Sequence, residues 1–226
     1  MTRKGLPHAG RDAFLSREAI LRSAAELFAE HGYASTTLED IGRRAGLSRG
    51  APGYQFGSKD KLYAAVVSRV FSEARDALLL ARDEAAEAEL DGRQGFTYAV
   101  GAYIDFLASH ADFVRLVEWE ALGHGDGLRG ASPHLDMVMA ALDSIGEALA
   151  PELPAGFDLT QLMLSIAGLC WFPIAHRETL GRVLQVDPLD RSFIQARKQH
   201  VVDLVVHGIS GSGRREERTC SDQASG

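Results

Sequence analysis

The chain contains little cysteine, and this excludes a disulfide framework. Only 2 of its 226 residues are cysteines, Cys170 in an apolar run and Cys220 in a polar stretch, whereas disulfide-stapled domains need several pairs. The first residues also lack the apolar segment of a secretory signal, because Gly, Pro, His and charged residues follow Met1. We therefore expect a cytoplasmic protein that is stabilised by an apolar core.

Long hydrophobic runs are also missing. The longest uncharged stretch is Leu159–Ala175, 17 residues that include Gln161, Ser165 and Pro173. A membrane span needs about 20 apolar residues. We expect this stretch to be a buried helix, and we expect no membrane partner.

Motifs of enzymatic or metal chemistry are scarce. The sequence has no Walker loop, no His/Glu pair at metalloprotease spacing and no Cys-x-x-Cys. An enzyme that uses the first 60 residues as a lid is the alternative from another class, and a helical scaffold is a third. A metal sensor would have to use widely spaced ligands, namely Glu118, Glu120, His124, His134 and His176. We expect no cofactor, no metal and no catalytic residue.

Charge is unevenly distributed along the chain. The whole chain has 24 basic and 31 acidic residues, a formal net charge of −7. Residues 1–62 carry 10 basic and 7 acidic residues, a net charge of +3, and the remaining residues carry 14 and 24, a net charge of −10. Such asymmetry between segments suggests contact with nucleic acid or a membrane at one end.

Apolar residues recur at three- and four-residue spacing along most of the chain, for example at Ile20, Ala24, Leu27 and Phe28. Two-residue alternation typical of strands is missing. The sequence therefore predicts an all-α fold of about nine helices. Glycine and proline breakers divide it into a flexible arm (1–15), a first domain (16–64) whose first helix Ser16 caps, a second helical domain (65–209) and a disordered tail (210–226).

Residues 37–50 have the pattern of two short helices separated by a glycine turn. Thr37 and Asp40 form a capping box with Asp in place of Glu, and Gly46 ends the helix that they start. Ser48 is placed to cap the second helix. This is the helix-turn-helix arrangement, which places its second helix in a DNA major groove. The alternative is an ordinary helical hairpin with solvated cations.

A longer string of residues resembles a known family. Residues 36–63, TTLEDIGRRAGLSRGAPGYQFGSKDKLY, follow the helix ILRSAAELFAEHGY, and together they closely resemble the DNA-binding region of TetR family transcriptional repressors. The resemblance implies a helical second domain that binds a small molecule and dimerises through its last two long helices. Repression is likewise implied by the family.

Pro52 and Gly53 depart from the family pattern, which commonly has an apolar residue and an aromatic there. With Ser48 as the cap, Pro52 would lie about four residues into the helix and remove an intrahelical hydrogen bond, and Gly53 would cost about 1 kcal/mol. We expect a short, poorly formed recognition helix. The candidate DNA-binding residues are Thr37, Arg44, Ser48, Arg49, Gly50, Tyr54, Gln55 and Lys59.

The second domain offers candidates for a pocket and a dimer interface. The candidate pocket residues are aromatic, polarisable or titratable side chains on helices that we expect to converge: Tyr103, Phe106, Trp119, Met163, Phe172 and His176. Glu118 and Glu120 are candidate polar anchors, and carboxylates in the pocket would favour a cationic ligand. Each of these is also a plausible core residue. The helix over about 158–184 is more apolar than the core of one chain needs, and the helix over about 192–207 is expected to supply the other half of a four-helix interface, so we expect a homodimer.

These observations predict a ligand-responsive, homodimeric DNA-binding regulator. The family resemblance implies that it binds a palindromic double-stranded operator as a repressor and is released by a small molecule of unknown identity. The alternative is a helical small-molecule-binding protein or enzyme that has lost DNA binding, because of the departure at Pro52 and Gly53.

Overall fold

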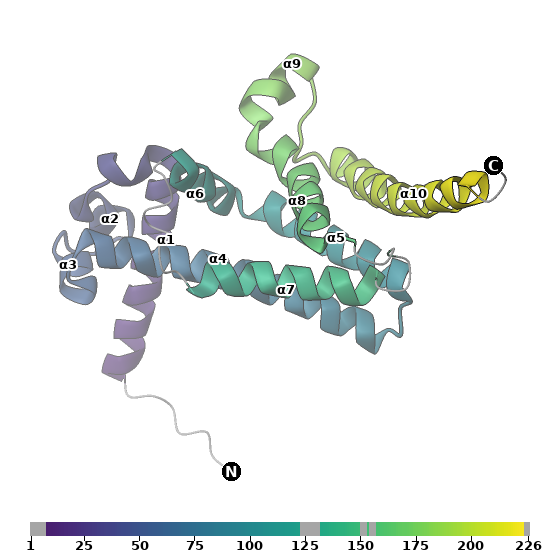
Figure 1. Cartoon of the computed structure of the whole chain (residues 1–226). Coiled ribbons are helices and arrows are strands. Elements are labelled where there is room, and N and C mark those ends of the chain that lie inside the picture. Colours follow the sequence, from purple (N-terminus) through teal and green to yellow (C-terminus); the bar gives the residue numbers. More distant parts are fainter. Residues whose placement is uncertain (1–7, 123–131, 150–152, 154–156, 224–226) are drawn as a thin grey trace, which may run out of the picture. The chain divides into compact units, whose positions relative to one another are not determined.

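The computed structural model describes residues 8–122, 132–149, 153 and 157–223. Within these ranges the fold is all-α, as predicted, with ten α-helices where about nine were expected (Figure 1). The helices are α1 (His8–Ser35), α2 (Leu38–Arg44), α3 (Ala51–Phe56), α4 (Lys59–Glu87), α5 (Gly92–Ser109), α6 (Ala111–Leu122), α7 (Ser132–Leu149), α8 (Leu159–Ala175), α9 (Arg182–Leu184) and α10 (Arg191–Gln223), with a π-helical segment, η2 (Arg177–Gly181), before α9. The predicted breakers at Gly123–Gly130 lie outside the described residues.

The chain forms two compact units. The head unit comprises Met1–Phe71 and Asp112–Ser132, and the body unit comprises Ser72–Ala111 and Pro133–Gly226. The head unit therefore includes α6, which the predicted boundary at residue 64 assigns to the second domain. Helix α4 is continuous through the boundary between the two units.

The head unit is built on a bent α1. Its apolar stripe is fully buried at Ile20, Ala24 and Phe28, as the helical spacing predicts. Gly32 has a positive φ of 75° and interrupts the helical geometry near the end of α1. With a ψ of 167°, this conformation is open essentially to glycine alone, so the residue type fits the interruption.

Helix α1 begins earlier than predicted. It starts at His8, so Ser16 lies inside the helix and its hydroxyl donates to the Asp12 carbonyl at 2.8 Å. The first helix thus begins inside the stretch predicted as a flexible arm (1–15), and residues 1–7 lie outside the described ranges. Ser16 can bond back to the preceding turn, which satisfies its hydroxyl without starting a helix.

The body unit packs α5 against α8 and α10. Side chains of α5 form the centre of its core, with Phe96, Val100, Ile104 and Leu107 buried. Carboxylates cap these helices: Asp91 forms a capping box with Gln94 at α5, and Asp190 accepts from the Ser192 amide at 2.8 Å at the start of α10. That bonding with Ser192 lowers the pKa of Asp190.

Helix α8 starts where predicted but ends sooner. Asp158 caps it by accepting from the Thr160 amide at 2.9 Å, whereas the helix predicted to run to residue 184 ends at Ala175. A bend of 57° separates it from the segment Arg177–Leu184. Among the described residues, no single helix has the length and hydropathy for a membrane crossing, although this bent pair passes those two criteria together.

Pro173 lies inside α8 and removes one helical donor. Because proline has no N–H, the carbonyl four residues earlier, at Leu169, loses its partner within the helix. Arg197 of α10 replaces it: its Nε donates to the Leu169 oxygen at 3.0 Å, and Nη2 donates to the same atom. The guanidinium therefore fastens α10 to α8 at the position of the proline.

Helix α10 extends beyond its predicted end. It is helical to Gln223, whereas the sequence predicted a disordered tail from Ser210. The segment Arg214-Arg215-Glu216-Glu217 consists of good helix formers. These residues continue a helix that is already nucleated, although the Gly/Ser composition before them is typical of a linker.

We predict that Arg197→Met lowers the free energy of unfolding by about 1–3 kcal/mol, because the Leu169 carbonyl is left without a donor. In a Pro173→Ala background the restored N–H of residue 173 can donate to the Leu169 carbonyl, so Arg197→Met should lower the free energy of unfolding by less. Urea unfolding of the four proteins measures the difference. Equal losses in the two backgrounds would contradict this role of Arg197.

Candidate nucleic-acid interface

Helix α2 and its following turn form as the sequence predicts. The Thr37 hydroxyl oxygen accepts from the Asp40 amide at 3.1 Å and so caps α2. The second bond of the predicted capping box differs, because the Asp40 carboxylate accepts from the Thr37 hydroxyl at 2.5 Å and a capping box uses the backbone N–H of the cap residue. This bond is the main cause of the lowered pKa of Asp40. After α2, Gly46 adopts a φ of 70° and the chain turns.

The turn brings the backbone after it very close to α2. A Cβ atom on Gly42 would lie 2.7 Å from the Ser48 carbonyl oxygen, 3.2 Å from the Arg49 Cα and 3.3 Å from the Pro52 Cδ. The Leu47 amide donates to the Gly42 carbonyl at 2.9 Å. Only glycine leaves room for this approach, which sets the position of the start of α3 relative to α2.

Helix α3 begins later than predicted, and this changes the meaning of its proline. The helix starts at Ala51 with Gly50 at the cap position, so Ser48 is not its cap. Pro52 is therefore in the first turn, where its missing N–H would have no intrahelical partner in any case. The expectation that Pro52 breaks a helical bond is wrong. The helix is nevertheless short, as predicted, with six residues.

The candidate residues of the turn and α3 are accessible. Ser48, Arg49 and Gly50 are exposed, and the Tyr54 side chain is 93% exposed. Gln55 is half-buried. A tyrosine side chain this exposed contributes little to the core, and its exposure therefore favours contact with another molecule.

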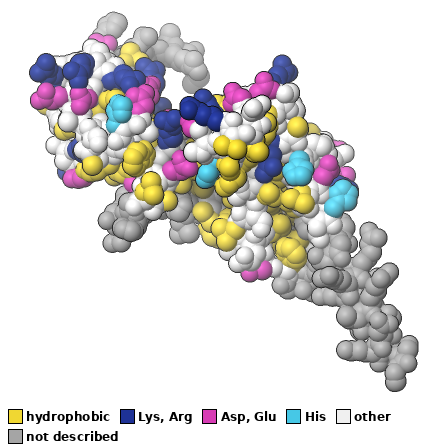
Figure 2. All heavy atoms as spheres, turned by 90° about the horizontal axis from the view of Figure 1, so that it is seen from above, with side chains coloured by type: hydrophobic (Ala, Val, Ile, Leu, Met, Phe, Trp, Pro, Cys, Tyr) yellow, Lys and Arg dark blue, Asp and Glu magenta, His cyan; other side chains and the backbone are white. Residues whose placement is uncertain are grey.

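Some basic side chains in this region are paired within the head unit, and others are exposed to solvent. Arg49 is exposed and lies 3.7 Å from a Glu39 carboxylate oxygen, whereas Arg44 is held by Glu26 at 3.1 Å and Glu30 at 2.8 Å. Figure 2 likewise shows Lys and Arg side chains beside carboxylates. Arg49 therefore has a single, long ion pair, which a phosphate or base could replace.

Lys59, predicted as a phosphate contact, has partners inside the head unit. Its Nζ donates to the Thr36 carbonyl at 2.8 Å and lies 4.2 Å from the centre of the Tyr33 ring. The ammonium thus satisfies a carbonyl near the end of α1 and stacks on an aromatic face. Any phosphate that it binds would share it with these groups.

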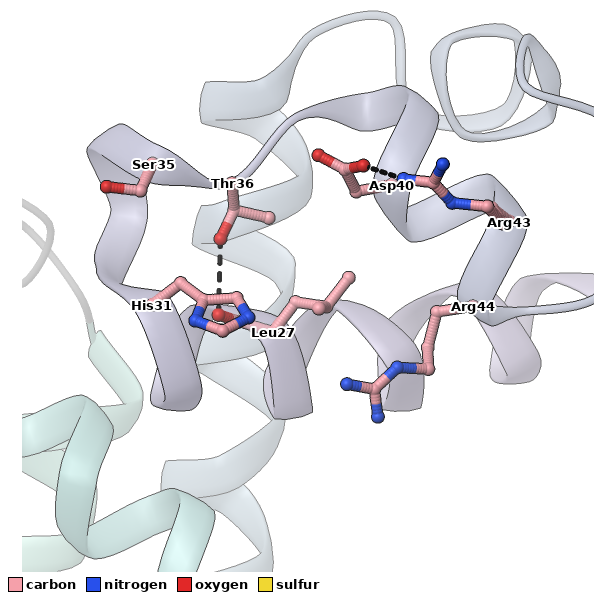
Figure 3. Close-up of a pocket in the computed structure, with 7 residues that line it drawn as sticks. All are labelled: Leu27, His31, Ser35, Thr36, Asp40, Arg43 and Arg44. Atoms are coloured by element: carbon pink, nitrogen blue, oxygen red, sulfur yellow. Dashed lines mark hydrogen bonds and ion pairs between the residues drawn. The ribbon is translucent and has the colours of Figure 1, made fainter.

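A polar groove of about 490 Å³ lies between the end of α1 and α2 (Figure 3). Asp40 and Arg43 face each other at its rim, and the Thr36 hydroxyl donates to the Leu27 carbonyl at 3.2 Å. Because Arg43 is paired with Asp40, and Arg44 with Glu26 and Glu30, the cations here are neutralised within the unit. The groove is consequently a weak anion site.

An aromatic cluster joins α6 to the rest of the head unit. The rings of Phe28, Tyr33 and Tyr63 contact one another with centroids 4.9 to 5.9 Å apart. The buried Tyr63 hydroxyl donates to Glu120 of α6, and Tyr33 donates to Asp60. Burial and the bond to Asp60 raise the pKa of Tyr33 to about 12.

Trp119 of α6 also belongs to this unit. Its indole N–H donates to the Ala29 carbonyl at 3.2 Å, and a Cβ atom on Gly32 would lie 3.3 Å from its ring. Trp119, predicted to line a ligand pocket, therefore packs on the bent end of α1. Glu120, considered as a ligand anchor, is bonded to Tyr63.

The other predicted pocket residues lie in the body unit. Tyr103 and Phe106 are on α5, Met163 and Phe172 are on α8, and His176 follows α8 directly. Phe172 is 50% exposed, and its ring stacks on His176 with centroids 4.3 Å apart. The six predicted residues therefore do not form one site within a single unit.

Cys170 and Tyr103 mark an apolar interior beside these residues. Burial raises the pKa of Tyr103, and it raises the pKa of the Cys170 thiol to about 12. A thiol with that pKa is protonated at neutral pH and reacts slowly. Among the described residues, no group of three or more His, Cys, Asp or Glu side chains could hold a metal ion.

The geometry defines a class of protein: a helix-turn-helix head with an accessible recognition segment, joined to a helical body. Comparison with known proteins agrees. Residues 20–66 match the family described as "Bacterial regulatory proteins, tetR family", and residues 93–205 match "Tetracyclin repressor-like, C-terminal domain". The chain belongs to the TetR family of transcriptional regulators, which are DNA-binding proteins and not enzymes.

Individual relatives show the breadth of the family. The chain is 26% identical over 200 residues to the HTH-type transcriptional repressor NicS of Pseudomonas putida, covering 86% of this chain and 92% of that protein. It is 33% identical over 101 residues to the HTH-type transcriptional activator FasR of Mycolicibacterium smegmatis, covering 45% of this chain and 44% of that protein. One relative is thus a repressor and the other an activator.

Solved structures share the fold. The transcriptional regulator FadR of Bacillus subtilis, in complex with stearoyl-CoA, superposes with a TM-score of 0.64 and 16% identity, covering 84% of this chain and 98% of that one. A TetR family regulator of Marinobacter aquaeolei gives a TM-score of 0.63 and 18% identity, covering 86% and 97%. Membership of this family implies a DNA operator and a small-molecule effector as partners.

We predict that Gly42→Ala destabilises the protein by about 1–3 kcal/mol, because the new methyl group overlaps the Ser48 carbonyl. Gly53→Ala is the matched control: its Cβ would meet only Leu38 Cδ1, at 3.8 Å, and alanine favours the helix by about 0.5–1 kcal/mol. Thermal unfolding should therefore shift in opposite directions. A loss of similar size in both variants would contradict the close approach at Gly42.

The bond between Tyr63 and Glu120 gives a second prediction. Tyr63→Phe should cost about 1–3 kcal/mol of unfolding free energy, because a buried hydrogen bond to a carboxylate is lost. Tyr98→Phe removes an exposed tyrosine bond to Glu84 and should have little effect. Urea unfolding followed by Trp119 fluorescence in a Trp171→Phe background measures both. Equal effects would show that burial of the Tyr63 bond contributes nothing.

Proposed function

We propose that the protein is a homodimeric, ligand-responsive repressor. Two copies of the turn and α3 enter successive major grooves of a near-palindromic operator, and a small molecule bound by the body unit releases them. The observation that carries this proposal is the helix-turn-helix whose exposed Arg49 and Tyr54 are presented by a backbone that Gly42 holds in place. Repression is supported by the similarity to NicS.

The candidate residues have separate roles in this proposal. Arg49 and Gln55 read base edges, since a guanidinium can pair with guanine and an amide with adenine. Tyr54, Thr37, Ser48 and Gly50 contact the phosphate backbone and set the register. Arg44 and Lys59 mainly hold the head unit together, because both have internal partners.

Helices α8 and α10 provide the dimer interface in this proposal. Helix α8 has an average hydropathy far above the other helices, yet Leu164 is 54% exposed and Phe172 is 50% exposed. Leu204 on α10 is also 50% exposed. Large apolar side chains exposed on two packed helices favour a four-helix interface with a second copy.

The effector is proposed to be a largely apolar molecule. The buried side chains of α5 and α8 are hydrocarbon or soft groups, including Val100, Ile104, Ile166 and Cys170. FadR of Bacillus subtilis, which has the same fold, is described with stearoyl-CoA. We therefore prefer an apolar ligand near Tyr103, Phe106, Met163, Phe172 and His176 to the cationic ligand that carboxylates would have favoured.

Helix α6 couples effector and DNA in this mechanism. It follows α5 of the body unit after one residue, yet it is fastened to the head by Trp119 and Glu120. A ligand that displaces the end of α5 would therefore alter contacts to α1 and α4. By linkage, ligand and DNA weaken each other by the same factor, typically about 1–3 kcal/mol.

Fluorescence anisotropy with labelled duplexes from the DNA that flanks the gene tests this proposal. We expect specific, salt-dependent binding of two protomers per duplex. Arg49→Ala should weaken it by about tenfold or more, whereas Glu39→Gln, which removes the carboxylate beside Arg49, should strengthen it. Arg93→Ala, a change at an exposed arginine of α5 in the body unit, is the control. Equal effects of Arg49→Ala and Arg93→Ala would contradict the assignment.

A further inference from the structure

The segment between α8 and α10 exposes an unusual number of large aliphatic side chains. We call Arg177–Asp190 the arm; it comprises η2, α9 and the turn before α10. Within it Val183 is 77% exposed, Leu184 is 67% exposed, Leu180 is 40% exposed and Val186 is 39% exposed. Figure 1 shows the arm projecting beyond the end of α8 before the chain returns to α10.

The arm has a defined structure despite this exposure. The Val186 amide donates to the Gly181 carbonyl at 2.9 Å, and a left-handed Gln185, with a φ of 56°, closes the turn. Gly181 is buried, and a Cβ atom there would lie 3.0 Å from the Val186 carbonyl oxygen. The backbone therefore holds Val183 and Leu184 outward at the tip.

Charged groups surround the apolar tip and pair with one another. Glu178 bridges Arg177 at 3.3 Å and Arg182 at 2.5 Å. An apolar centre inside a polar, mutually neutralised rim is the usual anatomy of a protein interface.

The apolar surface continues from the arm onto α8. Phe172 lies near the end of α8, one short bend before the arm, and Leu164 lies two turns earlier. These are the exposed residues assigned above to the α8 and α10 interface. A partner seated on that face therefore meets the base of the arm first and its tip next.

We propose that the arm packs on the body unit of a second copy of this chain. The inference rests on the proposed homodimer and adds the arm to its interface. In a two-fold symmetric dimer each copy contributes one arm and receives one, so the four exposed aliphatic side chains are buried twice. The arm then stabilises the dimer from outside the α8 and α10 bundle.

Sedimentation velocity of the full chain over a range of concentrations tests this. The Val183→Ser, Leu184→Ser double variant should raise the dimer dissociation constant by at least about tenfold, because four aliphatic side chains leave the interface. Leu122→Ser, at a 74% exposed leucine of the head unit, is the matched control and should leave the constant within about twofold. Circular dichroism checks that all variants remain helical.

The possible outcomes separate the proposed role of the arm from the proposed homodimer. A dimeric wild type with an unchanged double variant overturns the role of the arm and leaves the proposed homodimer intact. A monomeric wild type overturns both. Co-sedimentation of the wild type, but not of the double variant, with phosphatidylglycerol vesicles would assign the arm to a lipid surface and also overturn the proposal.

A second measurement follows the arm directly. Val183→Cys in a Cys220→Ser background carries an environment-sensitive dye, since Cys170 is buried. Its emission should shift to the blue over the same concentrations at which the dimer forms. An emission that stays constant through dimerisation would show that the tip remains in water.

Discussion

The functional end of the molecule depends on one close approach between backbones. Helix α2 and the residues after Gly46 come so near that only a hydrogen atom fits at Gly42. With that contact in place, the start of α3 is held by covalent geometry and short-range repulsion, which are stiff, and needs few side-chain contacts. This explains how a recognition helix of six residues holds its position while it leaves the Tyr54 side chain almost fully exposed.

Much of the fold follows from local rules. Thr37, Gly46 and Asp158 cap or end helices where their side chains and backbone freedom predict, and the apolar stripe of α1 is buried as its spacing requires. The helix starts that the sequence predicted wrongly depend on contacts and helix positions outside the local motif. Ser16 looks like a cap but finds a carbonyl in the preceding turn, and Pro52 looks like a breaker until the helix is seen to start at Ala51.

The roles of individual site residues were harder to predict. Composition counts Arg44, Arg49 and Lys59 alike as cations, but only the tertiary structure shows that Arg44 meets carboxylates of α1 and that Lys59 meets Tyr33. Trp119 lies 90 positions from Ala29, the residue whose carbonyl it binds. No periodicity or spacing rule reports a contact at that separation, so its place in the head unit could come only from the structure.

The discontinuous head unit has a consequence for synthesis of the chain. Residues that hold α1 and α4 are supplied by α6, which begins about 55 residues after the end of α3 and therefore leaves the ribosome later than the helix-turn-helix. Until then the bonds from the Tyr63 hydroxyl to Glu120 and from the Trp119 indole to the Ala29 carbonyl cannot form. The DNA-reading end is therefore translated first, but it is completed only after the first helices of the body have been made.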